Sequence, residues 1–239
     1  MKPLPECRLY AFVDTTYLRG RAPGAIARQL CDGGADLIQL RAKQSPLDEV
    51  RRVAEAVLPI TRRAGVGFVI NDHPSLAAEV GAEFCHLGQD DFFGAGYTDV
   101  SQLAVAMNPR EVQAIRKQAP PPLVRIGLSS AGPEQATRAV AAGAEYLGVG
   151  PVYRTGTKPT AKPVTLEYVR WAAANLRIPW FAIGGITLDN LDDVLAAGAQ
   201  RICVVSAILC ADDLAAVCRK FKDRLPPLDI GRPFGKFRL

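Results

Sequence analysis

Residues 141–150 read AAGAEYLGVG, and this short stretch decides the fold because close copies of it recur along the chain. It joins the end of an apolar-periodic helix to a glycine, which suits the left-handed conformation that ends helices, and a short apolar run follows at once. The other clear copies are CDGGADLIQL at 31–40, RAGVGFVI at 63–70, EVGAEFCHLG at 79–88 and AAGAQRICVV at 196–205. The repeat predicts that helices and strands alternate.

The runs that follow these glycines are almost continuously apolar, as expected for a parallel sheet covered on both faces. Eight strands are predicted, at residues 8–13, 37–40, 67–70, 84–87, 124–128, 146–149, 180–183 and 201–205. Helical periodicity separates them, most clearly at residues 46–64, 133–142 and 188–197. Eight β-α units favour a closed barrel over a doubly wound sheet, and no GxGxxG turn follows the first predicted strand. We expect a single (β/α)8 TIM barrel domain spanning residues 1–239.

Two segments depart from the repeat. Residues 90–109, after the fourth predicted strand, exceed the roughly 2–6 residues usual for a βα loop, so this enlarged loop is interpreted as a lid or a packed excursion. Residues 226–239 contain tandem prolines and two glycines and are expected to form an irregular tail.

Composition and charge exclude several classes of protein. The net charge of +5 resides in residues 219–239, which hold seven Lys or Arg and two Asp, so no basic face for nucleic acid is expected on the remainder. No apolar run approaches the ~20 residues that cross a bilayer, and the N-terminus lacks a signal-peptide pattern. Six cysteines show neither CxxC pairing nor metal-ligand spacing. The interpretation is a cytoplasmic protein without membrane contact; the sequence is compatible with a homo-oligomer.

Polar side chains follow the predicted strands, and in TIM barrels the loops after the strands carry the chemistry. The strand ends read QLRAK, IND, HLGQDD, GLSS, GPVYRTGTK, IGGI and VVS. Mg²⁺ is commonly held by one or two carboxylates together with phosphate oxygens, so Asp72 and Asp91 are predicted to form a pair of ligands, and Asp90 competes for the second place. The cations Arg41, Lys43 and Lys158 suit a diphosphate beside that metal.

A second anion site is predicted after the seventh and eighth strands, where barrels often bind phosphate through backbone N–H groups. Gly184, Gly185, Val205 and Ser206 occupy these positions, and residues 155–158 add hydroxyls and a charge. Two anion sites indicate two phosphorylated small-molecule substrates. For the histidines the structural roles are favoured: His73 as a residue at a helix start, and His86 as a satisfied core or near-site residue.

In this order, and across nearly the whole chain, the strand-end segments resemble those of thiamine phosphate synthases. The resemblance implies Mg²⁺-dependent coupling of a hydroxymethylpyrimidine diphosphate to a thiazole phosphate. It implies that Asp72 and Asp91 bind Mg²⁺, and that Lys158, Ser129 and Arg41 act in catalysis. The implied pyrimidine diphosphate ligands are Gln39, Arg41, Lys43, Asn71, Ser129 and Lys158. The implied thiazole phosphate ligands are Thr155, Thr157, Gly185, Val205 and Ser206.

Two alternatives stay open at this stage. A thiazole tautomerase of the same superfamily would share the barrel and the thiazole phosphate site without needing the diphosphate and metal residues. A non-catalytic paralogue that binds thiamine phosphates would use the enlarged loop as a contact surface. The chain also departs from the resembled pattern, because Ser130, Ala131 and Gly132 follow Ser129 where the family often carries a histidine.

Overall fold

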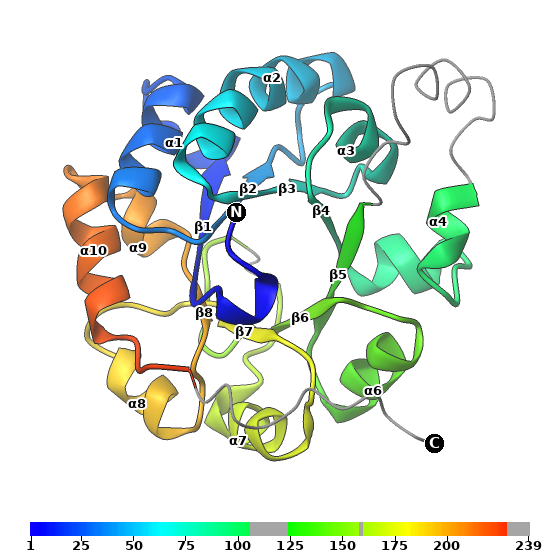
Figure 1. The fold of residues 1–239 in the computed structure, drawn as a ribbon. Coiled ribbons are helices and arrows are strands. Elements are labelled where there is room, and N and C mark those ends of the chain that lie inside the picture. The colour runs from blue at the N-terminus through cyan, green and yellow to red at the C-terminus, as the bar shows by residue number, and fades with distance from the viewer. Residues whose placement is uncertain (106–123, 158–159, 229–239) are drawn as a thin grey trace.

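The computed structural model describes residues 1–105, 124–157 and 160–228, and it contains a closed barrel of eight parallel strands in chain order. Figure 1 shows the strands as an inner ring with the helices outside it. The strands are β1 Leu9–Asp14, β2 Leu37–Arg41, β3 Gly67–Asn71, β4 Phe84–Leu87, β5 Arg125–Ser130, β6 Tyr146–Val149, β7 Trp180–Ile183 and β8 Ile202–Cys203. The predicted TIM barrel is confirmed.

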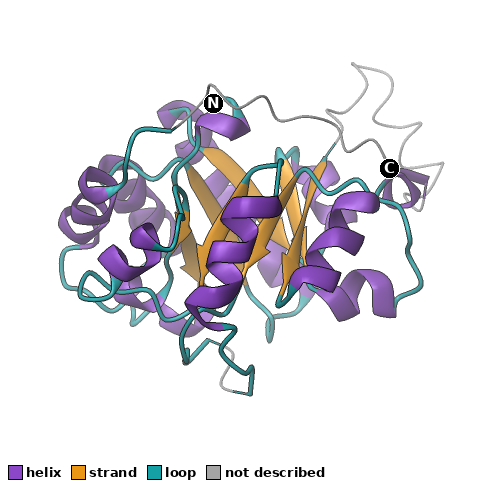
Figure 2. Ribbon diagram, turned by 90° about the horizontal axis from the view of Figure 1, so that it is seen from below, coloured by secondary structure: helices purple, strands orange, loops and turns teal. Residues whose placement is uncertain are grey.

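The helices form a layer around the barrel, which Figure 2 shows from the side. They are α1 Pro23–Asp32, α2 Leu47–Ala64, α3 Pro74–Val80, α4 Ser101–Val105, α6 Pro133–Ala141, α7 Thr165–Asn175, α8 Leu191–Ala196, α9 Ser206–Leu209 and α10 Leu214–Arg224. Proline stands at the first turn of α1, α3 and α6, where its missing N–H costs nothing. Gly65, with a φ of 67°, ends α2 in the left-handed conformation that the repeat predicted.

Aromatic side chains fill the barrel interior below the site. Tyr146 packs edge-on against Tyr10, Phe84 and Phe181, with ring centroids 5.8–6.0 Å apart. Its ring lies over Gly127 of β5, where an added Cβ would stand 2.1 Å from Cζ of Tyr146. The large ring of Tyr146 and the glycine at position 127 therefore lie in one layer of the core. Large and small residues that alternate in this way fill the interior of a barrel of this size.

The two ends of the barrel differ. The short 3₁₀ helix η1, Leu4–Glu6, precedes β1, and Leu4 is buried. Arg201 donates a 2.6 Å hydrogen bond to the main-chain oxygen of Pro5, which holds this segment against the start of β8. Because η1 covers the end at which the strands begin, the opposite end is the one left for ligands.

Several element boundaries differ from the predictions. β1, β2, β3 and β5 extend to Asp14, Arg41, Asn71 and Ser130, so polar residues expected in loops occupy the last strand positions. β8 is shorter than predicted because Val205, with φ −113° and ψ −89°, has left the extended conformation. The last predicted helix starts at Leu191, later than expected, because the side chain of Asn190 accepts from Thr187 N–H and holds a turn there.

The segment after β4 is not an open loop in its described part. It contains the π-helical turn η3, Asp90–Gly94, and then α4. Phe92 is fully buried, and the Val100 N–H donates to the Ala142 carbonyl at 2.9 Å. Residues 90–105 therefore pack against the rest of the barrel, as the packed-excursion interpretation of this segment predicts. Residues 106–109 lie outside the described residues. Of the expected tail, residues 226–228 have no regular structure, and 229–239 lie outside the described residues.

No helix in the described ranges has both the length and the apolar character needed to cross a membrane.

Candidate functional site

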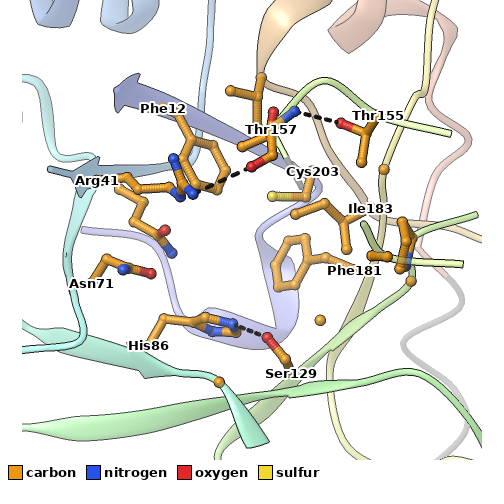
Figure 3. Close-up of a pocket in the computed structure, with 18 of the residues that line it drawn as sticks. Phe12, Arg41, Asn71, His86, Ser129, Thr155, Thr157, Phe181, Ile183 and Cys203 are labelled. Atoms are coloured by element: carbon orange, nitrogen blue, oxygen red, sulfur yellow. Dashed lines mark hydrogen bonds between the residues drawn. The ribbon is translucent and has the colours of Figure 1, made fainter. Parts of the chain in front are cut away.

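A cavity of about 480 Å³ opens at the carboxyl ends of the strands, and Figure 3 shows part of its lining. The structure brings to it the predicted residues Gln39, Arg41, Lys43, Asn71, Asp72, Asp91, Ser129, Thr155, Thr157, Gly185, Val205 and Ser206. Lys158, the remaining predicted residue, lies outside the described residues. These residues are spread between positions 39 and 206 of the sequence, so barrel closure is what assembles them.

Arg41 lines the cavity and is held in place by a buried ion pair. Its Nη1 lies 2.8 Å from a carboxylate oxygen of Asp14, a side chain with no exposed surface. Asp14 also accepts from the Thr16 N–H at 2.9 Å, which keeps the carboxylate in place. The other guanidinium nitrogen, Nη2, reaches the main-chain oxygen of Thr157 at 3.4 Å, as Figure 3 shows. Arg41 thus connects β2 to the segment after β6, and with it the two predicted anion sites.

Lys43 brings the two predicted metal ligands together. Its Nζ lies 3.0 Å from Asp72 Oδ2 and 3.8 Å from Asp91 Oδ2. Asp91 is positioned by η3, since the Gly88 N–H donates to its carboxylate at 3.2 Å. The geometry therefore favours Asp91 over Asp90 as the partner of Asp72. Asp90 also lines the cavity but forms no ion pair within the described part of the chain.

The backbone of Asp72 carries local strain. Its φ of 64° lies in the left-handed region, which is uncommon for residues other than glycine but tolerated best by Asn and Asp. Its N–H donates to the His86 carbonyl at 2.9 Å, continuing the β3–β4 pairing by one residue. This conformation places the carboxylate beside Lys43 instead of continuing the strand.

The donor set fits Mg²⁺ only together with a phosphate ligand. Residues 1–105, 124–157 and 160–228 contain no group of three or more His, Cys, Asp or Glu placed to hold a metal. Two carboxylates at one cation are, however, what Mg²⁺ usually takes from a protein when substrate phosphates and water complete its octahedron.

The predicted second anion site contains two glycines that side chains could not replace. Gly184 and Gly185 have φ of 103° and 65°, and added Cβ atoms would lie 2.4 Å from Pro151 Cβ and 2.5 Å from the Arg154 oxygen. Close by, the Thr157 N–H donates to Thr155 Oγ1 at 3.2 Å. Thr157 Oγ1 is buried and has no hydrogen-bond partner among the described residues. A buried hydroxyl without a partner is costly, so it marks a place where a ligand would supply one.

Sequence reasoning missed a line of hydrogen bonds that reaches the cavity at His86 and Ser129. His86 Nε2 lies 3.0 Å from Ser129 Oγ, as Figure 3 shows, and His86 Nδ1 lies 3.3 Å from Tyr146 Oη. The line continues to Tyr10 and Gln39. His86 also lines the cavity, and its position is compatible with the predicted core or near-site residue. A signal for Tyr146 was present in the sequence, because Gly127 interrupts an apolar strand and glycine inside a strand often marks a close approach.

A second missed group holds the start of η3. Gln89 Nε2 donates to the Ser129 carbonyl at 2.6 Å, and Arg138 donates to Gln89 Oε1 at 2.7 Å. The guanidinium of Arg138 also lies 3.9 Å above the Phe93 ring. These contacts join η3 to β5 and α6, and they position Asp91 relative to Ser129.

The chain is similar in sequence to one family of enzymes. A family model described as thiamine monophosphate synthase matches residues 9–208. A thiamine-phosphate synthase of Thermus thermophilus is 44% identical over 194 residues, covering 81% of this chain and 84% of the relative. That of Methanospirillum hungatei is 39% identical over 219 residues, covering 91% and 97%.

Solved structures give the same fold. The thiamine phosphate pyrophosphorylase of Pyrococcus furiosus superposes with a TM-score of 0.72 at 28% identity, covering 92% of this chain and 96% of that one. The 3-hexulose-6-phosphate synthase of Salmonella typhimurium shares the fold with a TM-score of 0.61 at 16% identity, over 91% and 98% of the two chains. The family match spans the barrel from its first strand to its last, and the chain belongs to the thiamine monophosphate synthase family.

Proposed function

We propose that this chain is a thiamine-phosphate synthase. It condenses 4-amino-2-methyl-5-(diphosphooxymethyl)pyrimidine with 4-methyl-5-(2-phosphooxyethyl)thiazole and releases thiamine phosphate and diphosphate. The observation that carries the proposal is the convergence of Asp72 and Asp91 on Lys43, in the same cavity as Arg41. The family membership and the relatives' names support the same activity.

The pyrimidine diphosphate occupies the half of the cavity formed at the ends of β2 to β6. Its proposed ligands are Gln39, Arg41, Lys43, Asn71, Ser129 and Lys158. Arg41 is the best-positioned cation for the leaving group, because Asp14 holds its guanidinium in the cavity lining and engages only Nη1, so that other N–H groups can bind phosphate oxygens. Arg41, Ser129 and Lys158 are the proposed catalytic residues, since they would bind the diphosphate as its negative charge increases.

Mg²⁺ is proposed to bind with the diphosphate at Asp72 and Asp91. When bound, the ion neutralises charge on the leaving group, and this is the chemistry it supplies. The protein's own contribution is to hold the two carboxylates at one place, through the backbone conformation of Asp72 and through η3 for Asp91. Lys43 Nζ lies within 4 Å of both carboxylates, and this positive charge would also suit an oxygen of the diphosphate.

The thiazole phosphate occupies the other half, at Thr155, Thr157, Gly185, Val205 and Ser206. The Thr157 hydroxyl then gains the partner that the described residues do not provide. Gly184 and Gly185 allow the chain after β7 to approach the segment after β6, so the phosphate is held between two loops. Arg41 contacts the same segment through the Thr157 carbonyl, so the two substrates meet at this residue.

The reaction is a substitution at the exocyclic methylene of the pyrimidine. The C–O bond to diphosphate breaks, its electron pair leaves with the diphosphate, and the thiazole nitrogen forms the new C–N bond. The electron-rich aminopyrimidine supports cationic character at that carbon, so a dissociative course is expected and no strong base is needed. Positioning and charge neutralisation provide the catalysis.

The direct test is to mix both substrates with purified protein, with and without Mg²⁺, and to measure thiamine phosphate and diphosphate. Formation of both products only with Mg²⁺ is expected, and Asp72→Ala or Lys158→Ala should abolish most of it. No product in either condition from correctly folded protein contradicts the proposal. Binding without turnover would favour a non-catalytic paralogue, and isomerisation of the thiazole alone would favour a tautomerase. The paired carboxylates favour the synthase over both.

A further inference from the structure

Four hydrogen bonds in series run from the barrel interior to the diphosphate half of the cavity. Gln39 Nε2 lies 2.5 Å from Tyr10 Oη, and Tyr10 Oη lies 3.1 Å from Tyr146 Oη. Tyr146 Oη then lies 3.3 Å from His86 Nδ1, and His86 Nε2 lies 3.0 Å from Ser129 Oγ. The five residues come from β2, β1, β6, β4 and β5. We call this series the Gln39–Ser129 line.

The side chains on this line are built into the core. Tyr146 is fully buried and Tyr10 nearly so, and both rings are held by aromatic neighbours. Gly127 leaves room for the Tyr146 ring, and an added Cβ on Gly148 would touch His86 Cε1 at 3.4 Å. Packing against neighbouring side chains, and not contact with solvent, therefore fixes the positions of the donors and acceptors.

Each side chain of the line can donate only a fixed number of hydrogen bonds. An amide nitrogen such as Gln39 Nε2 only donates, and a phenol donates once. Burial raises the pKa of Tyr10 and of Tyr146 far above the ordinary value, so both phenols keep their protons at any working pH. A neutral imidazole donates from one ring nitrogen and accepts at the other.

The direction of all four hydrogen bonds then follows from the first. Tyr10 accepts from Gln39 and therefore gives its proton to Tyr146. Tyr146 gives its proton to His86 Nδ1, which must be the accepting nitrogen. His86 Nε2 carries the imidazole proton and donates it to Ser129 Oγ.

We propose that Gln39, through Tyr10, Tyr146 and His86, orients the Ser129 hydroxyl so that its proton faces the cavity and is donated to an oxygen of the diphosphate. Ser129 Oγ accepts from His86, so its own proton has no acceptor on that side. In the opposite order of bonds Ser129 would donate to His86, and only its lone pairs would face the negatively charged diphosphate. Tyr10, Tyr146 and His86 are thus positioning residues. The proposal rests on the proposed function for the identity of the ligand.

The experiment is a measurement of the His86 tautomer in the free protein at pH 8, above the ordinary histidine pKa of about 6.5. Histidine labelled with ¹⁵N gives separate signals for protonated and unprotonated ring nitrogens. The chain has two histidines, so a His73→Asn variant assigns the spectrum. The expected result is a proton on Nε2 and none on Nδ1. A proton on Nδ1 overturns the proposal.

Gln39→Glu tests whether the far end of the line sets its direction. An ionised carboxylate only accepts, so Tyr10 must donate to it and every bond reverses. The His86 proton is then expected on Nδ1. An unchanged Nε2–H spectrum in folded Gln39→Glu shows that Gln39 does not set the order.

Tyr146→Phe is the second variant, and it keeps the proposal testable if Gln39→Glu fails to fold. It removes the donor to His86 Nδ1, so the Nδ1–H form is expected to become detectable. Tyr168→Phe is the matched control, because it removes a buried phenol that donates to the neighbouring Ser130 at 2.8 Å outside the line. Identical wild-type spectra in both variants would show that the line does not control the tautomer.

Binding of inorganic diphosphate with Mg²⁺, measured by calorimetry, tests the consequence for the ligand. Ser129→Ala is expected to weaken binding about tenfold, the order of effect for one hydrogen bond to a charged group. Tyr146→Phe should weaken it in the same direction, and Tyr168→Phe should leave it unchanged. Unaltered binding in Ser129→Ala overturns the donor role. These measurements need no turnover, so they separate failure of this proposal from failure of the proposed synthase activity.

Discussion

The guanidinium of Arg41 donates to the carboxylate of Asp14 at 2.8 Å, and no part of the Asp14 side chain reaches solvent. A buried carboxylate with one cationic partner fixes that cation's position. Asp14 is the last residue of β1 and Arg41 is the last residue of β2, and the register of the two strands places them side by side. Arg41 therefore faces the cavity with its orientation already set by Asp14.

Asp14→Asn should weaken diphosphate binding and lower the free energy of unfolding. The substitution leaves the Arg41 charge without its partner, and losing one member of a buried pair costs up to about 3–5 kcal/mol. We expect a raised KM for the pyrimidine diphosphate and a smaller change in KM for the thiazole phosphate. Asp36→Asn is the matched control, because Asp36 is also a buried, cation-paired carboxylate but lies at the start of β2. Equal KM changes in the two variants would contradict a positioning role for Asp14.

Asp91→Asn should raise the Mg²⁺ concentration needed for half-maximal activity, whereas Asp90→Asn should not. Asp91 shares Lys43 with Asp72, and Asp90 forms no ion pair within the described part of the chain. The expected shift is on the order of tenfold, since two unit charges about 4 Å apart interact by roughly 1–4 kcal/mol near a protein surface. Magnesium titration of initial rates measures it. A larger shift in Asp90→Asn would reverse the assignment of the second ligand.

Gly127→Ala should destabilise the barrel and displace Tyr146. An added Cβ would stand 2.1 Å from Cζ of the Tyr146 ring, and overpacking of this kind typically costs about 1–3 kcal/mol. Urea denaturation measures the loss, and the His86 spectrum reports the displacement. Gly132→Ala provides the control, because no heavy atom lies within 4 Å of its added Cβ. Comparable stability of the two variants would show that the Tyr146 ring moves freely.

Acid should weaken the protein partly through Asp36. Burial alone raises the pKa of this carboxyl, but the hydrogen bond from Lys222 and those from the N–H groups of Arg8 and Leu9 outweigh it and hold the pKa below 3.8. A depressed folded pKa contributes stability above the unfolded value, and this contribution is lost as the pH falls through the folded one. We expect the free energy of unfolding to fall less steeply below pH ~4 in Asp36→Asn than in the wild type. Parallel curves would mean that Asp36 titrates alike in both states.

Thiol labelling should find one fast-reacting cysteine, Cys210. It is the exposed cysteine, while Cys7, Cys85, Cys203 and Cys218 are buried and Cys31 is half-buried. Burial raises the pKa of Cys31 to about 11 and that of Cys7 to about 12, so neither forms a reactive thiolate at neutral pH. Labelling with a maleimide, followed by mass measurement, should give a single rapid adduct that Cys210→Ser removes. Rapid labelling that persists in Cys210→Ser would contradict the burial of the remaining thiols.

Most of the barrel could be predicted because its signals are local. A glycine after a helix and the apolar run that follows it specify an element boundary within a short stretch of sequence, as at Gly65 and Gly143. Once parallel strands are predicted, their carboxyl ends must lie at one edge, so residues such as Lys43 and Asp72 could be assigned to a common site. The π-helical turn at 90–94 gave no such signal, because the contacts that hold it come from β5 and α6.

The sequence by itself determined the fold class, the edge of the barrel that carries the site and the residue types gathered there, because these depend on periodicity and chain order. Only the tertiary structure decided that Asp14 holds Arg41, that Asp91 and not Asp90 meets Lys43, and that Gln39 connects to Ser129 through two tyrosines and a histidine. Tyr10 and Tyr146 are 136 positions apart, and their hydroxyls lie 3.1 Å from each other. Contacts of this kind depend on the closure and stagger of all eight strands together, and no stretch of sequence encodes them alone.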